Sequence, residues 1–433
     1  MKPADIAPPA PTGTDPDASP FRDAVLVHVV RQYKPSVGGL EDFVASLVAR
    51  QRGRFRRIRI ITCDRLFRGD GRKLAKREII NGAEVVRLPY IGSTRYPICM
   101  GVLSELADAD LVHVHAIDFF FDALAFTRRL HRKPLVATTH GGFFHSPDYR
   151  LLKRIWFRSI TRAAARRYGA LACCSESDYE RFARIAPDKV RLIENGVDIE
   201  KFAGAGSPAP AKSLITIGRL AHNKRVDRLL DTMTRLVASD PDWRLSIIGT
   251  PFDWSRDDVA AMIADRGLGG NVELHVGPSD AEMRDLIGKA SLFVSASQHE
   301  GFGIALIEAM SAGLSSVVEG NDAFAAFAQK HSGITLCDYG DPDGTAAAIR
   351  AAFAAIETDP QSARDAAIAQ AQAYSWDATA LRYEALYREV LGRWPGDGTA
   401  SGAVAPARLS AANPAQTSVA PTHSHKSAAV LIE

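Results

Sequence analysis

The stretch Leu292-Phe-Val-Ser-Ala-Ser-Gln-His-Glu300-Gly-Phe-Gly-Ile-Ala-Leu-Ile-Glu308 decides the fold class. It begins with a short apolar run, crosses a polar loop that contains two glycines, and ends in a helical pattern that runs to Gly313. A strand that passes directly into a helix is one half of a βαβ unit. The stretch therefore predicts a parallel sheet that is covered by helices.

The same alternation of strands and helices recurs along the chain in two series. The first series of predicted strands is Ala24–Val30, Ile58–Cys63, Glu84–Leu88, Leu111–His115, Leu135–Thr139 and Ala170–Cys174. The second is Leu214–Gly218, Arg244–Gly249, Val272–Val276, Leu292–Ala296, Ser315–Val318 and Ile334–Leu336. We therefore predict an α/β protein with two Rossmann-like domains that face each other across a cleft.

The domain boundaries follow from composition. Residues 204–212, rich in glycine, alanine and proline, are typical of a linker, so the domains are predicted at 23–203 and 204–393, and the last helix is free to cross back to the first domain. Residues 1–22 contain six prolines, and the end of the chain, 394–433, is rich in Ala, Ser, Thr and Pro. Both ends are predicted to be disordered, because they bury too little surface to offset the entropy of ordering.

Composition is that of a soluble globular protein, with 46% hydrophobic and 24% charged residues over 433 positions. No window reaches the run of about 18 apolar residues that a membrane span needs, and the start of the chain has no apolar signal-peptide core. We expect a cytoplasmic protein. The five cysteines show no CxxC spacing, so they are predicted to be reduced packing residues.

Charge is divided unevenly between the two halves. Residues 23–203 hold 32 Lys and Arg against 20 Asp and Glu, whereas residues 204–433 hold 19 against 27. A basic half of a cytoplasmic protein predicts an anionic partner, either a membrane or a nucleic acid.

The loop after the strand Leu292–Ala296 carries the most specific chemical signal. Gly301 and Gly303 flank Phe302, and the helix that starts near Gly303 points backbone N–H groups at the loop, where they can bind phosphate. Seven residues separate Glu300 from Glu308. Helix capping is the alternative role for such a glutamate.

Two further loops carry groups suited to phosphate. Arg219 and Lys224 follow the first strand of the second domain, where a planar fork and a mobile point charge together suit a diphosphate. Gly38 and Gly39 open the first helix of the first domain and leave its N–H groups accessible. A solvated loop and a tight turn are the respective alternatives.

His140 directly follows the fifth strand and precedes Gly141, so it is placed to bond a sugar hydroxyl or to stabilise charge near a reacting carbon. A purely structural histidine is the alternative. His113 and His115 share one face of a strand, but no third ligand stands at a recognisable metal spacing, so we interpret them as packing or cleft-lining residues.

Taken together, these motifs resemble the retaining glycosyltransferases of the GT-B fold, specifically family 4, whose mark is E-x7-E. The resemblance covers nearly all of 23–393 and depends on several matches in the same order along the chain. They are the Gly38-Gly39 loop, Asp110–His115, His140-Gly141, Asn195–Asp198, the Gly218-Arg219 to Lys224 segment, and Glu300 with Glu308.

The resemblance implies roles for the matched residues. Arg219 and Lys224 would hold the donor diphosphate, helped by Gly38 and Gly39. Glu308 would bind the ribose hydroxyls, and Glu300 and His140 would face the transferred sugar. The stretch Ser297–His299 before Glu300 varies in the family and leaves the choice of sugar open.

The resemblance also implies substrates. It is strongest to enzymes of acetan- and xanthan-type exopolysaccharide assembly, which implies α-1,3-mannosyl transfer with retention, from GDP-mannose to a cellobiosyl-diphospho-polyprenol. No metal is expected, because Arg219 and Lys224 supply the countercharge, and the pairs Asp108/Asp110, Asp240/Asp242 and Asp341/Asp343 fall at strand starts or turns.

Other classes fit less well. The chain lacks the GxGxxG of an NAD-dependent dehydrogenase and the GxxxxGK[ST] of a P-loop NTPase. A sugar-nucleotide epimerase and a non-catalytic sugar-nucleotide-binding scaffold remain as alternatives. Base, sugar, acceptor and oligomeric state cannot be read from the residues alone.

A basic helix predicts where the chain meets a membrane. Arginines recur every four residues from Arg150 to Arg166, beside an apolar row of Leu152, Trp156 and Ile160. We expect peripheral docking on the cytoplasmic face of the inner membrane through Arg150, Lys153, Arg154 and Arg158. The cluster Arg50, Arg52, Arg54, Arg56, Arg57 and Arg59 adds charge to the same half. Nucleic acid is the rival partner, but no nucleic-acid-binding motif accompanies the charge.

Overall fold

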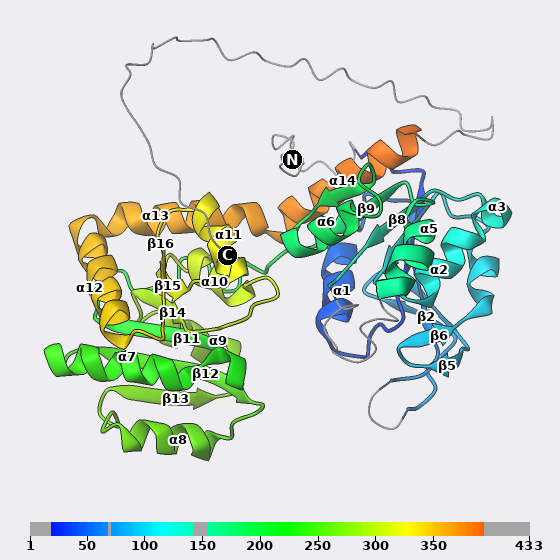
Figure 1. The fold of residues 1–433 in the computed structure, drawn as a ribbon. Coiled ribbons are helices and arrows are strands. Elements are labelled where there is room, and N and C mark those ends of the chain that lie inside the picture. Colours follow the sequence, from blue (N-terminus) through cyan, green and yellow to red (C-terminus); the bar gives the residue numbers. More distant parts are fainter. Residues whose placement is uncertain (1–18, 68–70, 142–153, 394–433) are drawn as a thin grey trace, which may run out of the picture. The chain divides into compact units, whose positions relative to one another are not determined.

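The computed structural model describes residues 19–67, 71–141 and 154–393. They form two main sheets, each flanked by helices (Figure 1). The first sheet has the strand order β10-β9-β8-β7-β1-β2-β4-β3 and is parallel except for the β3–β4 pair. Its strands are β1 (Val25–Val29), β2 (Arg57–Cys63), β3 (Arg77–Ile80), β4 (Ala83–Leu88), β7 (Leu111–His115), β8 (Leu135–Thr138), β9 (Ala170–Cys173) and β10 (Val190–Leu192).

The second sheet is parallel throughout, with the order β13-β12-β11-β14-β15-β16. Its strands are β11 (Ser213–Leu220), β12 (Arg244–Pro251), β13 (Val272–Val276), β14 (Leu292–Ser295), β15 (Ser315–Glu319) and β16 (Ile334–Cys337). In both sheets the strand order reverses beside the first strand, between β1 and β7 and between β11 and β14. Doubly wound sheets bind ligands at such switch points, outside the carboxyl ends of the strands.

Helices connect the strands and cover both sheets. Those of the first half are α1 (Gly39–Gln51), η2 (Met100–Leu106), α2 (Phe119–Phe126), α3 (Arg128–His131), η3 (Phe157–Thr161), α5 (Arg162–Ala165) and α6 (Glu176–Ala183). Those of the second half are η4 (His222–Lys224), α7 (Val226–Ser239), α8 (Arg256–Asp265), α9 (Asp280–Ile287), α10 (Ile304–Ser311), α11 (Asp322–Lys330), α12 (Pro342–Thr358), α13 (Pro360–Ala371), η5 (Gln372–Tyr374) and α14 (Trp376–Arg393). Polar caps begin several of them, such as the Ser255 and Ser279 capping boxes of α8 and α9.

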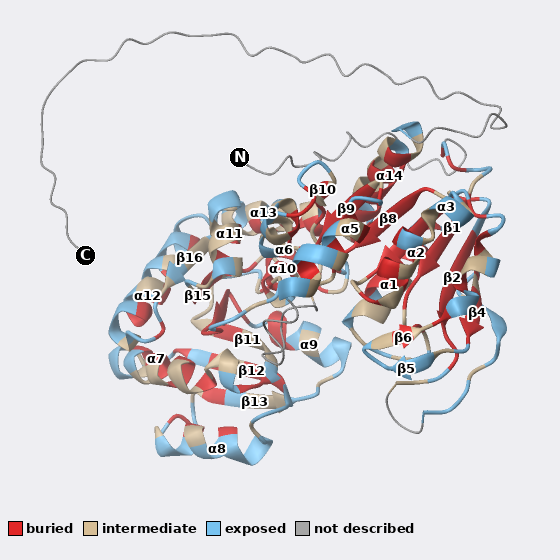
Figure 2. Cartoon of the chain, turned by 45° about the vertical axis from the view of Figure 1, so that its right-hand side comes forward, coloured by how far each residue is buried: buried red, intermediate tan, exposed pale blue. Residues whose placement is uncertain are grey.

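The central strands are buried on both faces, which explains their nearly continuous apolar sequences. In β1, Val25, Val27 and Val29 face one core, while Leu26 faces the other. Figure 2 shows the buried residues concentrated in the strands of both sheets and the exposed residues on the outer helix surfaces.

The last helix, α14, packs on the first sheet although it follows the second domain in the sequence. Tyr383, Leu386 and Tyr387 of α14 are fully buried against α1 and the strands. A Cβ atom at Gly169 would lie 2.5 Å from Val390 Cγ1, so this position admits no larger residue while the helix stays in place. Each buried side chain of this size contributes about 1.5–3 kcal/mol, so α14 is an integral part of the first core.

All twelve predicted strands are present, with ends within about two residues of the prediction. The sequence pattern did not predict β3, β10 or the two-stranded sheet of β5 (Ile91–Ser93) and β6 (Tyr96–Ile98). The predicted disorder of residues 1–22 was wrong for residues 19–22. Phe21 is buried and stacks on Phe55, with ring centroids 4.9 Å apart. The rest of that segment and residues 394–433 lie outside the described residues.

The predicted linker is tied to the second domain. Gly204 N–H donates to Ser311 O at 2.9 Å, Gly206 N–H donates to Ala312 O at 2.8 Å, and the guanidinium of Arg364 donates to Gly206 O at 2.7 Å. Just before the linker, Val197, Ile199 and Phe202 are already buried in the core of the second domain.

Candidate active site

The switch point of the second sheet brings Lys224 and Glu300 together. Lys224 ends the short η4 helix after β11, and Glu300 lies in the loop after the adjacent strand β14. Lys224 Nζ donates to Glu300 Oε1 at 2.5 Å, and the two side chains are only 20% and 17% exposed. The ammonium group and the carboxylate thus share one shielded place at the strand edge, where the charges are weakly screened.

Backbone contacts fix the two loops against each other. Gln298 N–H donates to Asn223 O at 2.8 Å, and Asn223 Nδ2 donates to His299 O at 3.2 Å. Asn321 Nδ2 donates to Ser297 O at 2.7 Å from the far side. These contacts hold Glu300 in position. They could not be predicted from the sequence, in which Ser297–His299 is a stretch that varies in the family.

Gly303 makes the turn from this loop into α10. Its φ of 95° lies in the left-handed region, and a Cβ there would come within 3.3 Å of Phe324 Cε1. Gly301 differs, because a Cβ built on it would meet nothing within 4 Å. Phe302 packs half-buried against the core of the second domain between them. The loop therefore offers open space at Gly301 next to the start of a helix.

Glu308 lies one turn into α10 and is half-buried. Burial raises the pKa of its carboxyl, and the charge of Lys201 opposes that rise. Lys201 Nζ also forms an ion pair with Asp280 Oδ1 at 2.8 Å. In the described residues Glu308 has no side-chain hydrogen bond, so its oxygens are available to a ligand's hydroxyl groups.

Arg219, at the end of β11, lies over an aromatic ring that sequence reasoning missed. Its guanidinium carbon is 4.5 Å from the ring centroid of Phe252, which is 63% exposed. Phe252 follows β12, the strand beside β11. Its position after a neighbouring strand was the signal that could have identified it, because the ends of parallel strands meet at one edge. Stacking on Phe252 orients the planar guanidinium.

Gly38 and Gly39 lie at the start of α1, as predicted, and the Glu41 carboxylate lies close to Gly38. A Cβ on Gly38 would lie 2.6 Å from Glu41 Oε2, and Ser36 Oγ donates to Glu41 Oε1 at 3.3 Å. Gly38 has an extended φ of 173°, so its own backbone does not demand glycine. A phosphate at these N–H groups would lie near the Glu41 carboxylate, whose charge opposes it.

His140 follows β8 and has a left-handed φ of 51°, which is strained for a residue with a Cβ. Its ring turns toward the first sheet: Nε2 lies 3.2 Å from His115 Nδ1, and Nδ1 lies 4.0 Å from Cys174 Sγ. Burial and the charge of Arg31 lower its pKa to about 3. The His140 ring is therefore neutral at physiological pH, and its contacts are hydrogen bonds rather than ion pairs.

His113 and His115 are buried together with His28 on the sheet face that α1 and α14 cover. Ligand nitrogens of the three lie within 4.8 Å of one another. Every one of their ring nitrogens has a partner within the described protein, which for His113 means Tyr387 OH and Thr138 Oγ1, each at 2.7 Å. The cluster is a satisfied polar network, in line with the packing interpretation of His113 and His115.

The three aspartate pairs have structural partners. Asp108 pairs with Arg59, Asp110 Oδ2 accepts from Val25 N–H at 2.7 Å, and Asp240 pairs with Lys212 at 2.6 Å. Asp341 caps α12. These contacts agree with the turn and strand-start roles predicted for the pairs.

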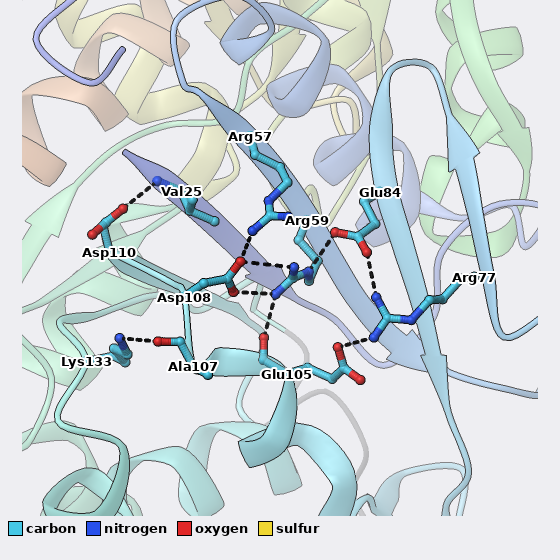
Figure 3. A network of polar contacts seen from close by, with 10 residues as sticks. All are labelled: Val25, Arg57, Arg59, Arg77, Glu84, Glu105, Ala107, Asp108, Asp110 and Lys133. Atoms are coloured by element: carbon cyan, nitrogen blue, oxygen red, sulfur yellow. Dashed lines mark hydrogen bonds and ion pairs between the residues drawn. The ribbon is translucent and has the colours of Figure 1, made fainter. Parts of the chain in front are cut away.

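The cluster Arg50, Arg52, Arg54, Arg56, Arg57 and Arg59 is largely neutralised within the fold. Arg59 donates to Glu84 at 2.9 Å and to Asp108 at 2.8 Å, and Arg57 pairs with the same Asp108 (Figure 3). Arg54 pairs with Glu384, and Arg50 pairs with Asp377. Four of its six arginines thus have carboxylate partners, so most of the charge of this cluster is balanced within the fold.

The basic helix differs from that cluster. Arg150, Leu152 and Lys153 lie outside the described residues, but Arg154, Arg158, Arg162 and Arg166 are exposed, and within the described chain none has an ion pair. The helix buries Phe157, Thr161 and Ala164, while Trp156 and Ile160 are half-buried and Ile155 is 56% exposed. None of the helices in the described residues is long and apolar enough to cross a membrane.

Comparison with known proteins identifies the class that this fold and site define. Residues 37–201 match the family described as Glycosyltransferase Family 4, and residues 198–372 match Glycosyl transferases group 1. The chain belongs to the family 4 glycosyltransferases, and the predicted GT-B fold is confirmed.

Its relatives narrow the class to mannosyltransferases. The chain is 40% identical over 370 residues to the GDP-mannose:cellobiosyl-diphosphopolyprenol alpha-mannosyltransferase of Xanthomonas campestris, covering 85% of this chain and 97% of the relative. It is 39% identical over 372 residues to the protein of the same name from Komagataeibacter xylinus, covering 85% and 94%. The predicted family and enzyme class are therefore confirmed.

Solved structures agree with this fold. A glycosyltransferase from Rickettsia africae aligns with a TM-score of 0.64 and 16% identity, covering 86% of this chain and 99% of that one. A sucrose-phosphate synthase from Thermosynechococcus elongatus aligns with a TM-score of 0.60 and 17% identity, covering 85% and 99%.

Proposed function

We propose that the protein transfers an α-mannosyl group from GDP-mannose to a cellobiosyl-diphosphopolyprenol, with retention of configuration. The observation that carries this proposal is the 40% identity that extends over 97% of a relative named for this reaction. The Lys224–Glu300 pair at a sheet switch point supports it, because this pairing of cation and carboxylate suits a donor that carries both a diphosphate and a sugar.

In this proposal Arg219 and Lys224 bind the donor diphosphate, with the α10 N-terminus nearby at Gly303. Glu308 binds the ribose hydroxyls, and Glu300 and His140 contact the transferred sugar. The backbone at Gly38 and Gly39 helps to hold the diphosphate. Binding of the diphosphate draws Lys224 toward the phosphates and leaves the Glu300 carboxylate to the sugar hydroxyls.

The reaction breaks the bond between the anomeric carbon and the diphosphate and forms a bond to the acceptor oxygen on the same face, through an oxocarbenium-like state, while the proton of the acceptor hydroxyl passes to the departing diphosphate oxygen. Negative charge grows on the departing phosphate. Fixed cations and N–H groups aimed at that charge contribute about 2–4 kcal/mol each to the transition state. No metal is needed where Arg219 and Lys224 provide the countercharge.

The test incubates purified protein with labelled GDP-mannose and cellobiosyl-diphosphopolyprenol, with UDP-glucose as the comparison donor. We expect labelled trisaccharide-lipid from GDP-mannose only, in equal yield with and without EDTA, and an α linkage by NMR. Release of an epimerised sugar nucleotide without transfer would support an epimerase instead. Loss of activity in EDTA that Mg²⁺ or Mn²⁺ restores would refute the metal-free site.

The acceptor lipid also requires a membrane partner. We infer that the first domain docks on anionic lipid through the exposed arginines of the basic helix, which form no ion pair with the described residues, and with the exposed Ile155 beside them. Each Lys or Arg near an anionic surface is worth about 1 kcal/mol. The pairing of Arg50, Arg54, Arg57 and Arg59 within the fold leaves this helix as the better candidate for docking.

Co-sedimentation with phosphatidylglycerol vesicles tests this inference. A triple variant, Arg154→Ser, Arg158→Ser and Arg162→Ser, should bind less than wild type, and wild-type binding should weaken above about 0.1 M salt, where the Debye length falls below about 10 Å. The control removes the same charge from exposed residues of the second domain, Arg256, Lys289 and Arg350. Equal binding by both variants would exclude the helix as the docking element, and preference for duplex DNA over vesicles would favour nucleic acid as the partner.

A further inference from the structure

A continuous chain of hydrogen bonds joins His140 to the interior of the first domain. His140 Nε2 lies 3.2 Å from His115 Nδ1, and His115 Nε2 lies 2.9 Å from His28 Nδ1. His28 Nε2 lies 2.9 Å from Gln51 Oε1 on α1. The three inner residues, His28, His115 and Gln51, are all fully buried, so the protein itself supplies the partners of their polar atoms.

The direction of this chain is set at Gln51. Its amide nitrogen donates to Tyr387 OH at 3.2 Å, so its oxygen faces His28 and accepts. A neutral imidazole carries one donor and one acceptor nitrogen. His28 must then carry its proton on Nε2 and accept at Nδ1.

The same rule propagates outward through the next two rings. His115 donates a hydrogen bond from Nε2–H to His28 and accepts one at Nδ1. His140 must then carry its proton on Nε2 and donate the hydrogen bond that His115 Nδ1 accepts. All the rings stay neutral, because burial lowers the pKa of His28 to about 4 and that of His115 well below its usual value. Among the described residues, His140 Nδ1 contacts the weakly bonding Cys174 thiol at 4.0 Å and no stronger donor.

We propose that Gln51, His28 and His115 are positioning residues that fix the tautomer of His140, so that His140 Nδ1 accepts a hydrogen bond from a hydroxyl group of the bound sugar. This inference rests on the proposed function for the identity of the ligand. The chain of bonds itself does not depend on it. The arrangement also explains the polar cluster on this sheet face, where two of the central strands each contribute histidine in register, His28 opposite His113.

The first test uses wild-type protein alone. Long-range ¹H–¹⁵N NMR of histidine side chains reports which ring nitrogen holds the proton. We expect the Nε2–H tautomer for His28, His115 and His140 at pH 7.5, and hydrogen-bond formation at His140 Nδ1 when GDP-mannose is added. An Nδ1–H tautomer or a protonated ring at His140 would overturn the proposal without any variant.

The second test compares Gln51→Met with Tyr383→Phe. Gln51→Met removes the acceptor for His28, so we expect a mixed His140 tautomer and a kcat about tenfold lower with unchanged GDP affinity. Tyr383→Phe is the matched control, because Tyr383 is buried on the same face but bonds Thr138 at 3.0 Å, outside the path to His140. It should keep the tautomer and kcat of wild type.

The outcomes separate the two proposals. A Gln51→Met protein that keeps a single Nε2–H tautomer at His140 would overturn the positioning role. Predicted tautomers in a wild-type protein that transfers no mannose would refute the proposed function and leave the hydrogen-bond chain standing.

Discussion

Lys224 offers a direct test of donor binding. Its ammonium group pairs with the carboxylate of Glu300 at 2.5 Å. Lys224→Met keeps the aliphatic stem that packs over Gly218 and removes only the charge. A lost charge-assisted hydrogen bond costs about 1.5–3 kcal/mol. We therefore expect GDP to bind at least tenfold more weakly, measured by isothermal titration calorimetry.

Lys289→Met is the control, because Lys289 is exposed elsewhere in the same domain. It should bind GDP as wild type does. Equal GDP affinity in Lys224→Met and wild type would show that Lys224 serves only as a partner of Glu300.

Individual residues also show which features of the site could be predicted from the sequence. The motif predicted that Lys224 and Glu300 lie at strand ends, since each directly follows an apolar run. It did not predict that they bond each other, because the neighbour relation of β11 and β14 is a property of the sheet order. The role of Phe252 was not predicted for the same reason. Nothing in the local sequence distinguishes an exposed phenylalanine in a loop from one that stacks on Arg219.

At the scale of elements, α14 joins the two halves of the sequence. Glu384 is nearly buried on this helix and pairs with Arg54 at 2.6 Å, whereas Asp377 on the same helix is 80% exposed and pairs with Arg50. Glu384→Ala leaves a partly buried guanidinium without its partner, which we expect to lower the free energy of unfolding by about 2–4 kcal/mol.

Asp377→Ala serves as the matched control and should change the free energy of unfolding by less than about 1 kcal/mol. Urea unfolding followed by tryptophan fluorescence measures both. If the two variants lose equal stability, α14 is not held on the first domain by the Arg54–Glu384 pair.

Elements that sequence missed are short or lie at sheet edges. β3 is mostly exposed, so its pattern does not carry the continuous apolar signal of the central strands. Asn81-Gly82 joins it to β4 with φ angles of 49° and 79°, the turn that Asn-Gly favours in a hairpin, and this dipeptide was the signal available. The sequence left the last helix free to cross back to the first domain, but it did not show that α14 packs on the first sheet, because helical periodicity gives a buried face and not the sheet that covers it.

At the scale of the whole molecule, buried ionisable groups determine how stability depends on pH. The unfolded chain protonates its histidines near pH 6.5, while the pKa of His28 is about 4 and that of His140 about 3 in the fold, and His113 and His115 are also well below the usual value. Above pH 6.5 these four groups are neutral in both states and do not change the free energy of unfolding. Below pH 6.5 they bind protons in the unfolded chain but not in the fold, so the free energy of unfolding falls as the pH falls toward their folded pKa values.

Two carboxyls act in the opposite direction. Burial raises the pKa of Asp118 to about 7 and that of Asp122 to about 6, so the folded state binds protons there that the unfolded state does not. Because four histidines bind protons in the unfolded chain and two aspartates bind them in the fold, the unfolded chain binds more protons overall in this pH range. We expect the free energy of unfolding to fall between pH 6.5 and 5, by about 1.4 kcal/mol per pH unit for each excess proton bound by the unfolded chain. Urea unfolding at pH 7.5, 6.5 and 5.5 measures it, and constant or rising stability would contradict the buried neutral histidines.

The most decisive measurement is mannosyl transfer by Glu300→Gln, together with GDP binding by the same protein. If Glu300 interacts mainly with the reacting sugar, kcat should fall by at least about 100-fold, while GDP binds as tightly as to wild type, or more tightly because Lys224 is freed. Glu273→Gln, an exposed change on β13 of the same sheet, should leave both unchanged. Wild-type turnover in a folded Glu300→Gln protein would contradict the placement of the reaction at the β11–β14 switch point.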